Sequence, residues 1–153
     1  MKRLQRLARV TEYLHRFRIL ERPEMKPILT VNQENVTSQL SRAAGEQLLI
    51  ALPEGRMSGR DTDTFDETVS FAFFALSKVN GPARTSDTAE VAYLRLLELM
   101  AGCLEQLERD LSGVGTGAPC PFLAGLNLTT ADVVPEYSIF GGWSGWYMEI
   151  VLE

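Results

Sequence analysis

The sequence has few of the residues that hold metals and disulfides. Its 153 residues include two cysteines and one histidine, and a structural zinc site needs four ligands of those types. Two cysteines are also too few for a disulfide-stapled scaffold, so we expect both thiols to be reduced, as in a cytosol. From this ligand count we expect neither a metal nor a cofactor.

Long apolar runs and an excess of basic charge are missing as well. No stretch approaches the roughly 20 apolar residues of a membrane span, and in the basic N-terminal stretch Arg6, Arg9 and Glu12 interrupt any signal-peptide core. The net charge of −5 argues against a general nucleic-acid binder. A hydrophobic content of 45% and a charged content of 23% are typical of a globular chain with a sizeable core. We expect a domain that contacts no membrane and does not bind nucleic acid directly.

The charge is divided unevenly along the chain. Residues 1–26 hold eight Lys and Arg against three Glu, a net of +5, whereas residues 27–153 hold seven against seventeen acidic residues, a net of −10. Over residues 2–20, apolar residues recur every three or four positions, which predicts an amphipathic helix. We expect residues 1–26 to be a basic helical arm that docks on a protein surface, with Arg6, Arg9 and Arg16 at the interface. A solvated helix face and contact with phosphates are the alternatives.

The first half of residues 27–153 contains two clear strands. Residues 28–31 fit a short strand, and residues 36–44 fit either a strand or a short helix. Residues 47–52 alternate and are closed by Pro53, and the polar, glycine-punctuated residues 54–67 predict a long connection. The next strand, residues 68–79, is apolar on both faces in its middle, which indicates a central position in a sheet.

The second half is organised around a long helix. Asp87 with Glu90 fits a capping box that opens a helix ending near Leu111. Its predicted buried face consists of Tyr93, Leu96, Leu97, Met100, Cys103, Leu104, Leu107 and Leu111. Residues 122–129 and 146–153 alternate as strands, with Pro135 interrupting between them. This order predicts one α+β domain over residues 27–153, with a mainly antiparallel sheet covered by one long helix, and an N-terminal amphipathic helix before it.

No catalytic arrangement is visible among the reactive residues. His15 lies among arginines on the basic helix, Cys103 is on the predicted apolar face, and Cys120 lies between two prolines. The glycines of residues 113–117 follow a helix and lack the Gly-Lys-Ser/Thr ending of a phosphate loop. Residues 61–67 begin like a calcium loop but lack its glycine and its bidentate glutamate. We therefore expect a protein that is not an enzyme.

Five aromatic residues gather near the C-terminus: Tyr137, Phe140, Trp143, Trp146 and Tyr147. Both tryptophans of the chain, Trp143 and Trp146, lie in a glycine-rich turn and the strand that follows it, next to Tyr147. Trp and Tyr carry many protein–protein interfaces, which makes these three residues candidates for an interface. The alternative is that Trp146 belongs to the core and Trp143 covers the edge of the sheet.

Three stretches together resemble the small α+β tail proteins of tailed phages and prophages, in the tail terminator and tail completion class. They are the predicted hairpin of residues 48–53 and 68–74, the helix of residues 87–111, and the closing run from Val134-Pro135 through Phe140-Gly-Gly-Trp-Ser-Gly-Trp to Ile150. The resemblance spans about residues 48–153 and does not include the basic helix. It implies a non-enzymatic protein that assembles in the host cytoplasm into a ring with itself and with other tail proteins, in the virion tail.

Two other classes of function remain open from the residues alone. One is a small-molecule-binding or enzymatic α+β domain without a recognisable motif. The other is an interaction module such as an adaptor or an inhibitor. A deep pocket that gathers Asp or Glu with Cys120 or His15 would favour the enzyme.

Overall fold

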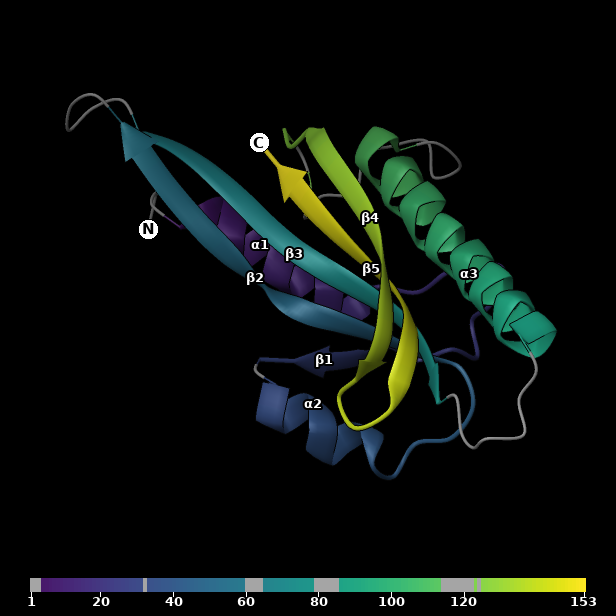
Figure 1. The fold of residues 1–153 in the computed structure, drawn as a ribbon. Helices are drawn as coiled ribbons and strands as arrows, with labels where there is room; N and C mark the ends of the chain where they lie inside the picture. The colour runs from purple at the N-terminus through teal and green to yellow at the C-terminus, as the bar shows by residue number, and fades with distance from the viewer. Residues whose placement is uncertain (1–3, 32, 60–64, 79–85, 114–122, 124) are drawn as a thin grey trace.

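The computed structural model describes residues 4–31, 33–59, 65–78, 86–113, 123 and 125–153. They form an α+β fold (Figure 1). In chain order its elements are α1 (Gln5–Arg16), β1 (Ile28–Thr30), α2 (Gln33–Leu40), β2 (Gln47–Gly59), β3 (Phe65–Lys78), α3 (Ser86–Ser112), β4 (Leu128–Ile139) and β5 (Trp143–Leu152).

The five strands form one sheet in the order β1-β2-β3-β5-β4. The pairs β2–β3, β3–β5 and β4–β5 are antiparallel, and β1 is parallel to β2. The sheet is therefore mixed, which corrects the expected mainly antiparallel sheet. The reason lies in residues 28–46, where the ambiguous stretch forms α2 and lets the chain cross over between two parallel strands.

The predicted end of the strand at Pro53 is wrong, because β2 continues to Gly59. The pairing with β3 shifts between Ala51 and Glu54, so β2 has one residue more than β3 across this step. A bulge leaves a residue outside the ladder, and such a position tolerates the missing N–H of proline. Most of the predicted connection over residues 54–67 is thus strand, and the β2–β3 hairpin is much longer than the sequence indicated.

Pro135 was expected to interrupt the last hairpin, but it lies inside β4. It pairs with Trp146 on β5, and β4 is the last strand of the sheet. An edge strand accepts proline because a backbone N–H on its outer side would have no neighbouring strand to donate a hydrogen bond to. The predicted strand over residues 122–129 falls largely before β4, which begins at Leu128, and residues 122 and 124 lie outside the described residues. The closing strand begins at Trp143, three residues earlier than expected.

Two helices, not one, cover the inner face of the sheet. Figure 1 shows α1 behind β2 and β3, with α3 running beside β4 and β5. The main core joins α1, α3 and the strands β2, β3 and β5; among its buried side chains are Val10, Leu14, Phe17, Ile50, Phe73, Met100, Cys103, Leu107, Met148 and Ile150. The apolar stripe of α1, which we expected to dock on a partner, therefore packs on the sheet of the same chain. Gly55 allows this approach, since a Cβ there would meet Leu7 at 3.2 Å.

The long helix α3 extends one residue beyond its predicted range at each end. The capping role expected for Asp87 lies outside the described side chains. Most of the predicted face is inside, but Leu97 is 36% exposed and Leu99, which the predicted face omitted, is buried. The cause is the segment after α1, which covers the Leu99 side of the helix.

A second, smaller core lies on the other face of the sheet. Val36 and Leu40 of α2 pack with Leu49, Leu76 and Trp143. Within residues 36–44 the helical alternative therefore holds as far as Leu40, where α2 ends, and not for residues 41–44. The rest of this face, over β2, β3, β5 and β4, carries no helix among the described residues and is called the open face below.

Candidate protein-binding surface

The predicted interface arginines lie on α1 in different surroundings. Arg6 is half-buried and donates from its guanidinium to the Glu67 carbonyl oxygen at 2.7 Å. The Glu67 carboxylate also accepts a hydrogen bond from the backbone N–H of Leu7 at 2.9 Å. This N–H is in the first turn of α1 and has no acceptor within the helix, and a negative charge is favourable at that end of a helix. Arg9 is half-buried and Arg16 is exposed. Arg6 thus joins α1 to β3, which is a structural role.

The three predicted aromatic residues separate onto two faces. Trp143 is 2% exposed and is covered by α2 of its own chain, so its side chain is not open to a partner as the interface interpretation expected. Trp146 packs under α3, where its indole N–H donates to the Tyr93 carbonyl oxygen at 2.8 Å. Tyr147 lies on the open face against Phe74, with ring centroids 5.0 Å apart. Of the three, Tyr147 alone reaches the open face.

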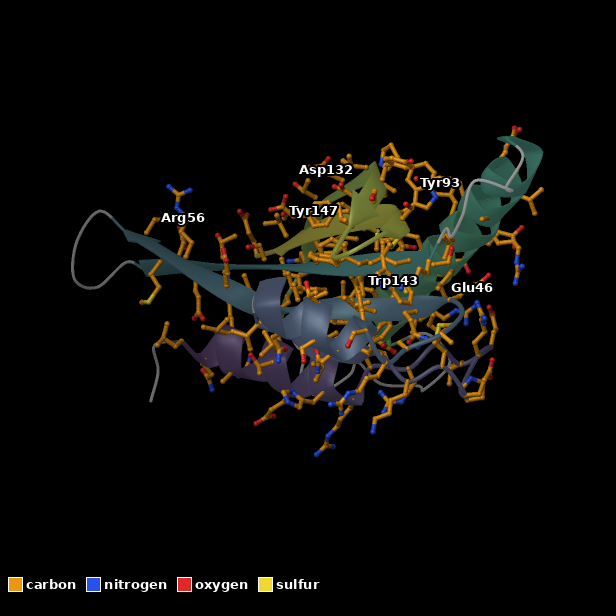
Figure 2. All side chains as sticks on the ribbon, turned by 60° about the horizontal axis from the view of Figure 1, so that its bottom comes forward. Glu46, Arg56, Tyr93, Asp132, Trp143 and Tyr147 are labelled. Atoms are coloured by element: carbon orange, nitrogen blue, oxygen red, sulfur yellow. The ribbon has the colours of Figure 1, made fainter. Side chains whose placement is uncertain are left out.

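The open face is rich in acidic groups. Figure 2 shows Tyr147, Asp132 and Arg56 on the same side of the sheet, with α1 on the other side. An open hollow of about 260 Å³ is lined in part by Glu54, Phe74, Tyr147 and Glu149. Partial burial and, after it, the Glu149 carboxylate raise the pKa of the Tyr147 hydroxyl above its usual value. The hollow therefore carries two carboxylates, Glu54 and Glu149, beside the Tyr147 hydroxyl.

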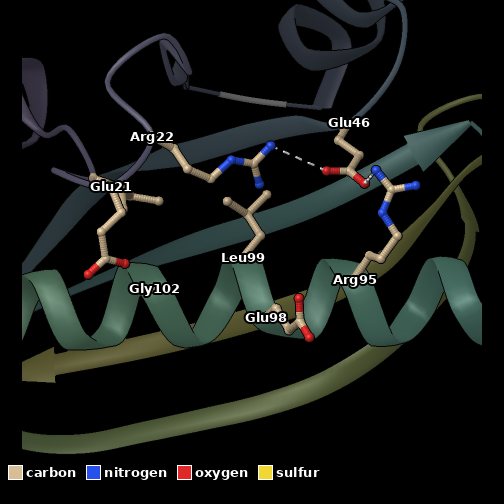
Figure 3. Close-up of a pocket in the computed structure, with 8 residues that line it drawn as sticks. Glu21, Arg22, Glu46, Arg95, Glu98, Leu99 and Gly102 are labelled. Atoms are coloured by element: carbon tan, nitrogen blue, oxygen red, sulfur yellow. Dashed lines mark ion pairs between the residues drawn. The ribbon is translucent and has the colours of Figure 1, made fainter.

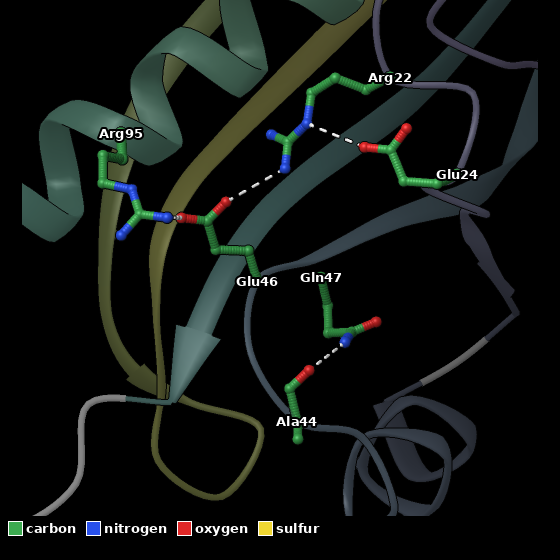
Figure 4. Close-up of polar contacts among 6 residues, drawn as sticks. All are labelled: Arg22, Glu24, Ala44, Glu46, Gln47 and Arg95. Carbon is green, nitrogen blue, oxygen red and sulfur yellow. Dashed lines mark hydrogen bonds and ion pairs between the residues drawn. The ribbon is translucent and has the colours of Figure 1, made fainter.

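In a notch between α3 and the segment after α1, several charged side chains pair with one another. Glu46 forms ion pairs with Arg95 at 2.8 Å and with Arg22 at 3.6 Å, and Arg22 also lies 3.8 Å from Glu24 (Figures 3 and 4). The two ion pairs of Glu46 connect the residue just before β2 to the segment after α1 and to α3, while the Arg22–Glu24 pair lies within that segment. The ion pairs of the notch therefore stabilise the fold.

Of the reactive residues named from the sequence, His15 and Cys103 lie in the described ranges, one exposed and the other in the core. His15 is exposed, with Nδ1 at 2.9 Å from the Thr11 carbonyl oxygen. Cys103 is fully buried, and burial raises the pKa of its thiol to about 12. Cys120 and most of the glycine loop lie outside the described residues, as do residues 61–63. Within the described ranges, no three His, Cys, Asp or Glu side chains are placed to hold a metal ion.

Exposed apolar side chains concentrate on α3 and β4. Of the nine large hydrophobic residues that are exposed in the described part of the chain, six belong to these two elements: Val91, Leu94, Leu97, Val133, Val134 and Tyr137. We call this set the α3–β4 surface. Single exposed hydrophobic residues are ordinary, but six of them on two neighbouring elements make these elements the candidate interaction surface.

The two elements of the α3–β4 surface are held side by side. The Tyr93 hydroxyl on α3 donates to the Glu136 carbonyl oxygen on β4 at 2.7 Å. Val133 pairs with Met148 of the main core, so it lies on the α3 side of the sheet, and Val134 pairs with Tyr147 on the open face. The surface therefore wraps around the outer edge of β4, where backbone groups have no strand to pair with.

Sequence reasoning missed this surface for two reasons. Val91 and Leu94 stand on the side of α3 opposite its buried face, a departure from amphipathic order that was visible in the sequence. Tyr137 belongs to the aromatic cluster near the C-terminus, but Val133 and Val134 fall in no predicted strand, because the prediction places a break at Pro135.

The α3–β4 surface can bury apolar area against a partner and can extend the sheet by a strand, and both are means of protein–protein association.

None of the helices in the described ranges is long and apolar enough to cross a membrane. The chain matches no known protein-family model, and a search of curated proteins finds no match either.

Proposed function

We propose that this chain is a structural assembly protein of a phage or phage-like tail, which contacts itself and other tail proteins in a ring in a terminator or completion role. It is not an enzyme in this proposal, and it assembles in the host cytoplasm. The observation that carries the proposal is the α3–β4 surface: six exposed large apolar residues beside an unpaired sheet edge.

The shape of the α3–β4 surface favours a protein partner. An apolar helix face next to a free strand edge can bury side chains and satisfy backbone groups in one contact. The hollows on the described surface are open and are lined by charged or mixed side chains. An apolar ligand pocket is instead concave and closes around most of its ligand.

The tail assignment is supported by the resemblance of three stretches. In the structure they fall on β2 and β3, on α3, and on the end of β4 with β5. These elements contain both sides of the α3–β4 surface.

The location of the protein in particles tests the proposal. Particles from the source organism are examined by immunogold electron microscopy with an antibody against this chain. Label confined to one end of the tail, together with rings of the purified protein in negative stain, is the expected result. Particles that carry no label would refute the tail role.

A further inference from the structure

We infer that the open face binds a partner protein through an arginine side chain that enters the hollow beside Tyr147. This arginine belongs to an extended segment of a protein other than this chain. The inference goes beyond the proposed function, because it concerns another face of the sheet and does not depend on the tail role.

The strand register builds the hollow. Ala51 on β2 pairs with Ala72 on β3, which pairs with Glu149 on β5, and Glu54 pairs with Ser70 in the next row. The small side chains of these rows form the floor, and the longer side chains around them form the walls. Pockets for small-molecule ligands measure roughly 300–1,000 Å³ and enclose most of the ligand. The open volume of about 260 Å³ instead suits one long side chain that reaches in from outside.

One wall of the hollow is aromatic. Phe74 lies between Phe140 and Tyr147, with ring centroids 5.4 Å and 5.0 Å away. Phe74 and Tyr147 both line the hollow. The three rings hold one another in place, so this wall exists before a partner binds. The face of such a ring attracts a cation.

The charged side chains that line the hollow are both acidic. Glu54 and Glu149 are exposed, and in the part of the chain that the structure describes neither forms an ion pair. Asp132 on β4 pairs with Glu149 and adds a third carboxylate nearby. Arg56 lies on the same side of the sheet (Figure 2), but it stands further along β2, opposite Thr68, and does not line the hollow. The occupant is therefore a cation.

Rings beside carboxylates favour arginine over other cations. A flat guanidinium stacks on an aromatic ring and donates to carboxylates in pairs, whereas the lysine ammonium is a compact charge that holds its water more strongly.

The arginines of a second copy are poor candidates for this hollow. The described arginines of residues 1–26 all have contacts within their own chain: Arg6, Arg9, Arg16, Arg18 and Arg22. The occupant therefore comes from a different protein.

Peptide binding tests the inference on the full chain. The probe is a fluorescent short peptide of alternating arginine and serine, because an extended chain presents every second side chain to the same surface. A citrulline peptide keeps the shape without the charge, and a lysine peptide keeps the charge without the flat group. Fluorescence anisotropy at physiological salt measures the affinities.

Two variants and a control locate the contact. Glu54→Gln with Glu149→Gln removes both carboxylates, and Tyr147→Leu removes the ring. The control, Glu105→Gln with Glu108→Gln, removes two exposed carboxylates from α3. Circular dichroism checks that each variant is folded.

We expect the arginine peptide to bind saturably, and the variant without the two carboxylates to bind it about fivefold or more weakly. Tyr147→Leu should weaken binding about two- to fivefold, and the control should behave as wild type. No saturable binding, equal binding of the lysine or citrulline peptide, or an equal loss in the control would overturn the inference. Acetyl-arginine amide that binds as tightly as the peptide would show a site for small cations, and self-association that depends on Glu54 and Glu149 would identify a second copy as the occupant. Either result would overturn the inference, and the tail role, which is tested on particles, would stand.

Discussion

Trp146 on β5 donates its indole N–H to the carbonyl oxygen of Tyr93 on α3, and the two rings meet edge to face at 6.0 Å. This pair fastens the beginning of the long helix to the sheet. It also connects to β4, because the Tyr93 hydroxyl donates to Glu136. The geometry of the α3–β4 surface therefore depends on these two residues.

Trp146→Phe should destabilise the fold. It removes one hydrogen bond, for which we expect about 0.5–1.5 kcal/mol, together with part of the buried ring. Urea unfolding measures the free energy. Tyr147→Phe, on the open face of the same strand, is the control: it removes a hydroxyl that bonds the exposed Glu149 side chain instead of a buried partner, and it should change the free energy much less. Equal losses for the two variants would contradict the role given to the Trp146–Tyr93 contact.

Two leucines on α3 should respond very differently to truncation. Leu107 is fully buried, so Leu107→Ala should lower the free energy of unfolding by about 2–5 kcal/mol. Leu94 is 56% exposed, and Leu94→Ala should cost less than about 0.5 kcal/mol in the isolated chain. Denaturant titration of both variants gives the comparison. A large loss at Leu94 would show that this side of α3 is covered within the chain.

Two glycines should show opposite signs when changed to alanine. At Gly145 a Cβ would overlap the carbonyl oxygen of Ala75 on the neighbouring strand, so Gly145→Ala should cost more than about 2 kcal/mol. At Gly102, inside α3, a Cβ would make ordinary contact with Ile19 at 3.8 Å. Gly102→Ala should therefore stabilise the protein by about 0.5–1 kcal/mol through helix propensity. Thermal unfolding checks both signs, and a stabilised Gly145→Ala variant would contradict the close approach of β3 and β5.

The thiol of Cys103 should make stability depend on alkaline pH. Burial raises its pKa from 9.0 to about 12. Its favourable contribution is fully present below pH 9 and falls as the pH rises from 9 toward 12, because the unfolded chain then loses the proton first. We measure the difference in unfolding free energy between wild type and Cys103→Ala. This difference should fall over that range by up to about 1.4 kcal/mol per pH unit, and a constant difference would contradict the buried thiol.

The spacing of apolar residues along the sequence predicted two kinds of element correctly: those with one buried face and those buried on both faces. The range of α3 and the central position of β3 follow from repeated apolar residues that the structure places in the main core. The two proline errors have a common cause: a bulge at Pro53 and the free edge at Pro135 remove the need for an N–H, and neither the pairing register nor the edge is visible in one sequence. The sequence did not predict that the apolar side chains of α1 pack on the sheet of the same chain. An apolar stripe shows that one face of a helix is covered, but it does not identify the surface that covers it.

The contact between Glu67 and the start of α1 has a consequence for the motions of the hairpin. The outer parts of β2 and β3, from Gly55 to Gly59 and from Phe65 to Thr68, pair with each other and extend past the end of β5. Two strands alone are marginally stable in water. Here α1 lies beneath them, and Glu67 accepts from its first backbone amides. We therefore expect the first turn of α1 to unwind together with the opening of the hairpin end, so that the amide protons of both segments exchange with solvent at a common rate.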